Sequence, residues 1–308
     1  MNLLHVSPTP HERGRMSVRH IMFCVILALL PTTIAGCITF GNRAVLLLAV
    51  CVCSSVIWEA LCRILMKRDQ TIGDCSAALT GLLLGLSLSP LIPIWQALVG
   101  TFTAIVVVKQ LFGGLGQNFA NPAATARIVM LVSFQGTMTS WLMPQSDAVI
   151  SATPLVTKSE NYMDLLLGNS AGCIGETCAV ALILGGLYLW LRGIISCAAP
   201  VGMIATVALF SFLIGENPLY QVLSGGLLLG AIFMATDYVT TPITKNGKLI
   251  FGIGCGFLTC VIRFWGTAYP EGVSFSILLM NLLTPYIDRM TKTIPFGSVH
   301  QKKEAAKS

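Results

Sequence analysis

Long apolar runs separated by short polar connections dominate this chain. A helix needs about 20 apolar residues to cross the hydrocarbon core of a membrane, so these runs predict membrane-spanning helices. Two sets of spans are expected: near 21–40, 44–66, 74–89, 94–112 and 122–134, then near 174–191, 195–214, 218–235, 249–265 and 272–288. The pattern therefore predicts an all-α polytopic membrane protein of about ten spans, some of them short or broken.

The two sets of spans resemble each other. Gly81-Leu82-Leu83-Leu84-Gly85 in the third span recurs as Gly226-Leu227-Leu228-Leu229-Gly230 in the eighth. Such a word is common in membrane helices, but each set also ends on a proline-led helix, opened by Asn121-Pro122 and by Tyr269-Pro270-Glu271-Gly272. Five spans in each set give the second set the opposite orientation, so the duplication predicts two inverted five-helix repeats.

Basic residues predict how the spans are oriented. Threading from a cytoplasmic N-terminus places one group of cations on a single side, which should be cytoplasmic: Arg13, Arg15, Arg19, Lys67, Arg68, Lys109, Arg192, Lys245, Lys248, Arg289, Lys292, Lys302, Lys303 and Lys307. Both termini are then cytoplasmic, in the inner membrane of a bacterial cell. The expected organisation is a first repeat over 1–134, an external loop over 135–172, a second repeat over 173–291 and a basic cytoplasmic tail over 292–308.

Composition excludes several classes of protein. Of 308 residues, 55% are hydrophobic and only 10% are charged, so lipid is the expected surrounding and no nucleic-acid partner is expected. Most of the eleven cysteines fall inside apolar runs, where they suit packing, and no Cys-x-x-Cys spacing occurs. We therefore expect no metal site held by this chain alone.

Two breaks between helices are candidate ligand sites. The glycine-rich segment 113–123, which contains Asn121, leads into a helix whose free N-terminal amides could receive an anion or a ring edge. The alternative is a turn in which glycines merely let helices approach closely. Asp237 lies among threonines at the end of the eighth span, which suits a heterocycle or a hard cation as well as an ordinary polar helix end.

Charged residues inside the spans are costly and need partners. Arg127 and Arg263 lie in or against apolar sequence, so each is expected to bind an internal partner or an anionic ligand. Glu59 and Arg63 lie one helical turn apart, a spacing that predicts a structural ion pair.

Three groups of residues, in the same order along nearly the whole chain, resemble a known family. They are Phe112-Gly113-Gly114 through Asn121-Pro122-Ala123, Met234-Ala235-Thr236-Asp237 with Thr241-Pro242, and Arg263 with Gly266, Tyr269-Pro270-Glu271-Gly272-Val273 and the segment 275–281. The chain is similar to the D subunit of the Rnf ion-translocating electron-transport complex, a family shared with the B subunit of the sodium-translocating NADH:quinone reductase. The resemblance implies ten helices in two inverted repeats, in agreement with the repeat above.

The resemblance also implies a cofactor. Family members carry FMN joined through its phosphate to a threonine, and the matching residue is Thr153. The family pattern Asp-Gly-x-Ser-Gly-Ala-Thr reads here as the segment 147–153. It keeps Asp147, Ala152 and the acceptor hydroxyl of Thr153 and departs from the pattern at Ala148, Ile150 and Ser151. A flavin fixed in an outer loop would stay in place through both redox states. A second flavin, riboflavin, is expected near Asn121 or Asp237.

By resemblance, the chain is a non-catalytic subunit of a translocase. The complex would pass electrons between ferredoxin and NAD and move Na⁺ or H⁺, with a second FMN-carrying subunit among this chain's partners. A secondary transporter remains the rival, because such carriers also use inverted repeats, broken helices and intramembrane charges. A structural scaffold would leave the burial of Arg127 and Arg263 unexplained.

Overall fold

A computed structural model describes residues 17–144, 149–150, 155, 161–266 and 272–292. Its first half is helical apart from two short strands: α1 (Val18–Phe40), α2 (Asn42–Leu65), η1 (Ile72–Asp74), α3 (Ser76–Leu86), α4 (Ile94–Phe102) continuing as the π-helix η2 (Thr103–Gln110), α5 (Pro122–Ser133), α6 (Gln135–Met138), β1 (Trp141–Leu142) and β2 (Val149–Ile150). The strands pair in antiparallel register.

The second half repeats the alternation of long and broken helices. It contains α8 (Tyr162–Leu167), α9 (Ala179–Leu191), α10 (Ala198–Ile214), α11 (Pro218–Leu223), α12 (Leu227–Leu229) continuing as the π-helix η3 (Gly230–Met234), α13 (Lys245–Trp265) and α14 (Val273–Met290). Each of the ten predicted spans coincides with a helix or, for 218–235, with a helix broken between α11 and α12. Gly225 and Gly226 occupy that break with φ values of +71° and +66°, a conformation that favours glycine.

Three of the described helices are long and apolar enough to cross a membrane: α1, α2 and α13. Five shorter apolar stretches accompany them, namely α3, α4 with η2, α5, α9 and α10. The short third span predicted near 74–89 is confirmed, because α3 has only 11 residues.

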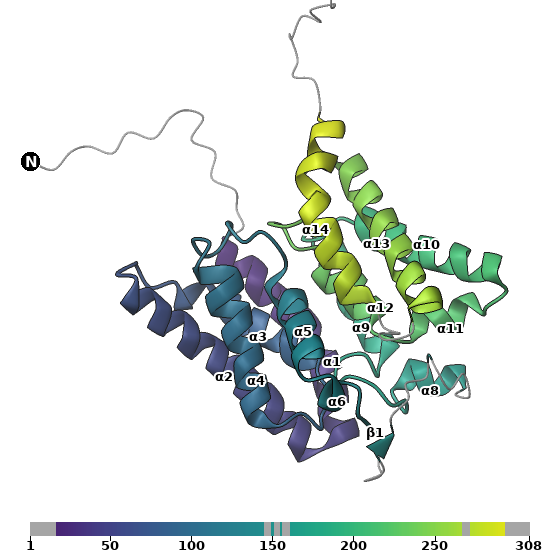
Figure 1. Ribbon diagram of the computed structural model, residues 1–308, viewed down its shortest axis with the longest axis horizontal. Helices are drawn as coiled ribbons and strands as arrows, with labels where there is room; N and C mark the ends of the chain where they lie inside the picture. Colours follow the sequence, from purple (N-terminus) through teal and green to yellow (C-terminus); the bar gives the residue numbers. More distant parts are fainter. Residues whose placement is uncertain (1–16, 145–148, 151–154, 156–160, 267–271, 293–308) are drawn as a thin grey trace, which may run out of the picture.

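The two halves pack against each other through equivalent helices. The first helices of the halves, α1 and α9, are in contact, and so are the last helices, α5 and α14. Within the halves, α2 packs on α3 and α4, while α10 packs on α11 and α13. Figure 1 shows residues 18–138 on one side of the molecule and the helices from α10 to α14 on the other. The centre of the molecule is therefore built by both halves.

Close helix contacts within each half depend on glycine. A Cβ on Gly81 of α3 would lie 2.5 Å from the carbonyl oxygen of Cys51 on α2. A Cβ on Gly256 of α13 would lie 2.7 Å from the carbonyl oxygen of Met203 on α10. Membrane helices approach this closely where small residues let backbones meet.

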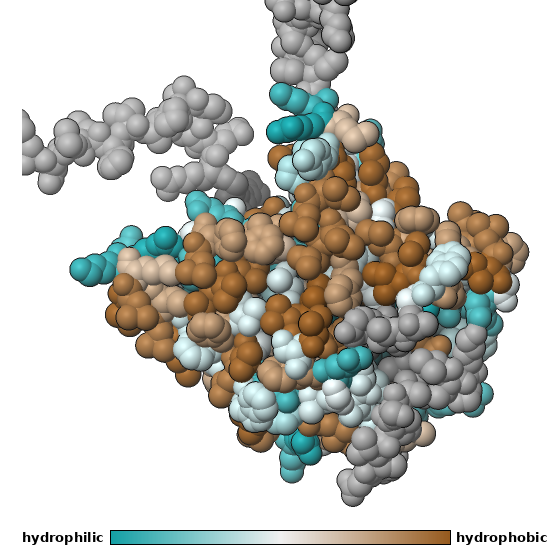
Figure 2. All heavy atoms as spheres, in the orientation of Figure 1, coloured by the Kyte–Doolittle hydropathy of each residue, from teal (hydrophilic) through white to brown (hydrophobic). Residues whose placement is uncertain are grey.

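Hydrophobic side chains cover the outside of the helices. Ile38, Leu65 and Met290 are 78%, 80% and 82% exposed, which would be unfavourable in water but suits contact with lipid. Figure 2 shows hydrophobic residues across the helix faces and hydrophilic residues gathered toward opposite ends of the molecule. The segment α6–β1 lies at one end, opposite the start of α1 and the end of α14 (Figure 1).

Candidate functional site

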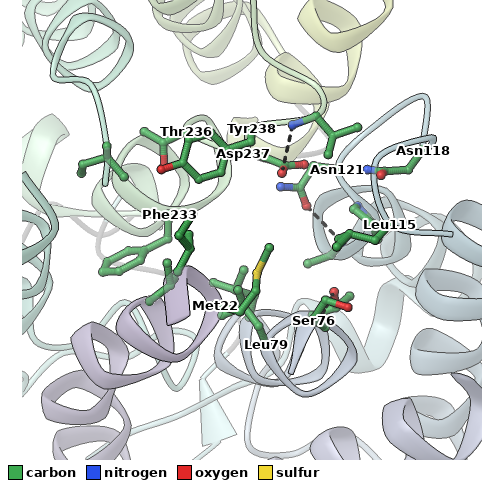
Figure 3. Close-up of a pocket in the computed structure, with 18 of the residues that line it drawn as sticks. Met22, Ser76, Leu79, Leu115, Asn118, Asn121, Phe233, Thr236, Asp237 and Tyr238 are labelled. Atoms are coloured by element: carbon green, nitrogen blue, oxygen red, sulfur yellow. Dashed lines mark hydrogen bonds between the residues drawn. The ribbon is translucent and has the colours of Figure 1, made fainter. Parts of the chain in front are cut away.

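A pocket lies where the two halves meet, at the ends of α3, η2 and η3. About 790 Å³ of space lies within its bounds, a figure that includes the open solvent at its mouth. Apolar walls come from α1, α3, α9 and η3, while its polar lining is Ser76, Thr80, Lys109, Asn118, Asn121, Thr236, Asp237 and Tyr238. Figure 3 shows Ser76 and Leu79 facing Asn121 and Asp237 across this space.

Asn121 joins the start of α5 to the second half. Its Oδ1 accepts hydrogen bonds of 3.1 Å from the N–H groups of Ala123 and Ala124, and its Nδ2 donates to the carbonyl of Met234 at 3.1 Å. The Asn121 side chain therefore caps two first-turn amides of α5, one of the groups that the sequence leaves open to a ligand. Asn121 therefore lines the pocket and also joins the two halves of the chain.

The glycine-rich segment before Asn121 needs its glycines for conformation. Gly113, Gly114 and Gly116 have φ values of +126°, +101° and +91°, which side chains rarely allow. The segment returns the chain from η2 to α5 and places Asn118 in the pocket wall, where its Nδ2 donates to the Ala120 carbonyl at 3.1 Å.

Asp237 lies beside Asn121, in the turn that follows η3 (Figure 3). Its Oδ2 accepts from the Thr240 hydroxyl at 3.1 Å, and its Oδ1 accepts from the Val239 N–H at 3.4 Å. Burial raises the pKa of the Asp237 carboxyl, although these hydrogen bonds favour the charged form. The carboxyl can therefore hold a proton more readily than an exposed aspartate.

A buried ion pair reaches the pocket wall through its lysine, Lys109. Lys109 Nζ lies 3.1 and 3.2 Å from the two carboxylate oxygens of Glu59 and 2.6 Å from the Ser76 hydroxyl. Glu59 also accepts from Thr71 at 3.0 Å and from the Gln110 amide at 2.9 Å. The predicted Glu59–Arg63 pair is wrong: Arg63 donates instead to the carbonyl of Asp69 at 2.9 Å.

Arg127 and Arg263 belong to a second cluster, away from the pocket lining. Arg263 donates to the carbonyls of Gln221, Ser224 and Gly225 at 2.6, 3.1 and 3.2 Å, so it satisfies the backbone at the α11–α12 break. Arg127 is 5% exposed, and its Nη2 lies 3.1 Å from Cys173 Sγ. The expectation that these arginines have internal partners is confirmed.

The second cluster lies beside Leu155, which follows the predicted flavin attachment site by two residues in the chain. The side chain of Leu155 and Arg263 Nη2 both lie against Gly225, while Arg127 Nη1 lies near Gly226. Thr153 itself, with Asp147, Ala148, Ser151 and Ala152, falls outside the described residues. Of the predicted site residues, the structure therefore brings Asn121 and Asp237 together in one place and Arg127 and Arg263 together in another.

Sequence reasoning misses the roles of Lys109, Glu59 and Ser76 in the pocket region. The sequence assigns Lys109 only to the cytoplasmic side, although its position at the end of an apolar run could mark it as a buried cation that needs a partner. Its partner, Glu59, lies 50 positions away in the chain. The helical spacing that points to Arg63 is the more local signal, and it is misleading.

Apolar helices, breaks at glycine, and polar side chains around a central pocket define this chain as an integral membrane protein. A model described as the NQR2, RnfD, RnfE family matches residues 5–297. The chain belongs to this family.

Curated relatives match the chain over almost its whole length. The D subunit of the Na⁺-translocating ferredoxin:NAD⁺ oxidoreductase complex of Acetobacterium woodii is 47% identical, over 98% of both chains. The D subunit of the proton-translocating ferredoxin:NAD⁺ oxidoreductase complex of Clostridium ljungdahlii is 41% identical, over 96% of this chain and 97% of the relative. The D subunit of an ion-translocating oxidoreductase complex of Stutzerimonas stutzeri is 40% identical, over 92% and 93%.

Proposed function

We propose that this chain is the D subunit of an Rnf-type complex that passes electrons between ferredoxin and NAD⁺ and moves Na⁺ or H⁺ across the membrane. The observation that carries the proposal is full-length similarity to the D subunits of two such complexes, at 47% and 41% identity. The subunit acts as a membrane-embedded electron carrier and is not catalytic alone. Its partners are the other subunits of the complex, including a second FMN-carrying subunit.

We propose ten membrane spans in two inverted repeats as the architecture. The equivalent packing of α2 with α4 and of α10 with α13, and the contacts α1–α9 and α5–α14, support this arrangement. The repeats occupy residues 1–134 and 173–291, with the loop 135–172 on the external side and the tail 292–308 in the cytoplasm of a bacterial cell. The position of α6–β1 at the end opposite the α1 start supports this orientation (Figure 1).

Covalent FMN on Thr153 is the first cofactor in the proposal. The chemistry beside this loop fits the group, because Leu155, two residues later, packs against Gly225 next to the Arg263 guanidinium. Arg127 lies at the adjacent Gly226. The buried Arg127 and the half-buried Arg263 would favour a phosphate and a reduced ring nearby. When bound, the flavin supplies one- and two-electron transfer, and the protein supplies position and polarity.

A second flavin, riboflavin, is proposed for the pocket between the halves. Its apolar walls suit a planar ring, while Asn118, Asp237 and the hydroxyl groups suit the polar edge of a heterocycle. Asn121 holds the two sides of the pocket at a fixed separation through its bond to Met234. Asp237 can hold a proton on its carboxyl, because burial raises its pKa.

A vesicle experiment tests the assignment to an electron-transfer complex. Inverted membrane vesicles are prepared from three strains of the native host. One strain lacks the gene for this chain, one carries the wild-type gene and one carries Thr153→Val. Reduced ferredoxin should drive NAD⁺ reduction and uptake of ²²Na⁺ or protons only with the wild-type chain. Ion movement that needs this chain but no electron donor would instead favour a secondary transporter.

A further inference from the structure

The Glu59–Lys109 ion pair has a defined orientation relative to the pocket. Lys109 and Ser76 line the pocket, whereas Glu59 does not, so the ammonium group is the end of the pair nearer to any occupant. Asp74 lies behind Ser76 in the same way, with Oδ1 accepting from the Ser76 hydroxyl at 2.6 Å and from its N–H at 2.8 Å. The wall formed by η2 and α3 therefore presents positive charge, with both carboxylates behind it.

The geometry fixes this charge in place. The three protons of the Lys109 ammonium have three acceptors, two on Glu59 and one on Ser76. Lys109 and Glu59 side chains are 3% and 0% exposed, so water screens the pair little. Lys109 thus needs no hydrogen bond to an occupant and acts on it through its electrostatic field.

Stability alone does not account for such a pair. Apolar residues of similar volume in place of a buried ion pair often leave stability unchanged or increase it. Ionisable groups at membrane depth are therefore read as functional by default. The side of the pocket opposite Lys109 carries Asp237, whose carboxyl adds negative charge when ionised.

We infer that Lys109 is a positioning residue that sets the charge preference of the pocket. Its ammonium group favours an occupant that gains negative charge on reduction, and the Glu59 carboxylate behind it weakens the positive potential that the occupant experiences. This inference rests on the proposed flavin in the pocket. Reduction adds negative charge to a flavin ring unless protons follow each electron, so the ammonium group stabilises the reduced form more than the oxidised form. Removing the carboxylate behind it should strengthen that preference, and removing both charges should abolish it.

The test uses the intact complex purified from the native host, in wild-type form and with Glu59→Gln or Glu59→Gln/Lys109→Met. Lys245→Met is the matched control, because it removes an exposed lysine at the start of α13. Acid extraction counts the flavin that is not covalently bound, and spectroelectrochemistry gives the midpoint potential of that flavin. The double variant guards against misfolding, because it leaves neither charge buried alone.

The midpoint potential should move in opposite directions in the two variants. Glu59→Gln should raise it and the double variant should lower it, while Lys245→Met should leave it unchanged. A purely structural role would not produce shifts of opposite sign. Extractable flavin with the same potential in all variants would overturn the role of Lys109 and leave the flavin site standing. A wild-type complex with no extractable flavin would overturn both.

Discussion

Removing Lys109 alone should destabilise the protein strongly. At 3.1 Å, the attraction between the two charges is about 5 kcal/mol for an effective dielectric constant of about 20. Desolvation offsets part of that attraction in the intact pair, but a single substitution leaves Glu59 buried without its cation. Such a change costs about 3–5 kcal/mol, so Lys109→Met should lower the free energy of unfolding by that amount.

Replacing both partners should cost much less than replacing one. In Glu59→Leu/Lys109→Met no buried charge remains at this pair, so the expected change in unfolding free energy is about zero or slightly favourable. Glu59→Leu alone should cost about as much as Lys109→Met. The double-mutant cycle should therefore give a large coupling energy, because the double variant loses much less stability than the sum of the two single variants.

Titration of the purified chain with SDS in detergent micelles, followed by tryptophan fluorescence, measures these free energies. The control is Lys245→Met, which removes an exposed charge and should change stability by less than about 0.5 kcal/mol. A loss below about 1 kcal/mol for Lys109→Met, or additive single effects, would refute the reasoning, because either result means that water reaches the pair.

Two further predictions concern helix packing and the pocket carboxyl. Gly256→Ala should lower the thermal midpoint of the purified chain, because its Cβ would lie 2.7 Å from the backbone of Met203. Gly254→Ala is the control and should be tolerated, because its Cβ would meet only the flexible end of the Met280 side chain. Equal losses of thermal midpoint in the two variants would contradict this prediction. Asp237→Asn should increase stability at alkaline pH. Burial raises the pKa of the Asp237 carboxyl in the folded state, so the wild type loses stability as the pH rises from the unfolded-state pKa through the folded-state pKa. The variant has no carboxyl at this position and does not show this loss. The difference in thermal midpoint should disappear at acidic pH, and a difference that grows there would be inconsistent with a raised pKa.

The positions of the helices could be predicted from sequence, because apolar runs and their glycine or proline boundaries are local signals. The proline-led start at Asn121-Pro122 is an example, since α5 begins at Pro122. The short length of α3 was also visible in the sequence.

Contacts between distant segments could not be predicted in this way. The sequence singles out Asn121, but its bond to Met234 joins residues 113 positions apart, and no helical spacing reports such a contact. The same is true of Glu59 with Lys109, where a local rule favoured Arg63 instead. The separation of Arg127 and Arg263 from the pocket likewise depends on how the two halves pack together.

In-gel flavin fluorescence of the denatured protein tests the central claim most directly. The chain is produced in its native host as wild type, as Thr153→Val and as the neighbouring control Thr157→Val, and each band is excised for mass spectrometry. We predict a fluorescent band carrying one FMN in the wild type and in Thr157→Val, and no fluorescence in Thr153→Val. A wild-type band of normal abundance without fluorescence or added mass would contradict the account and favour the secondary transporter.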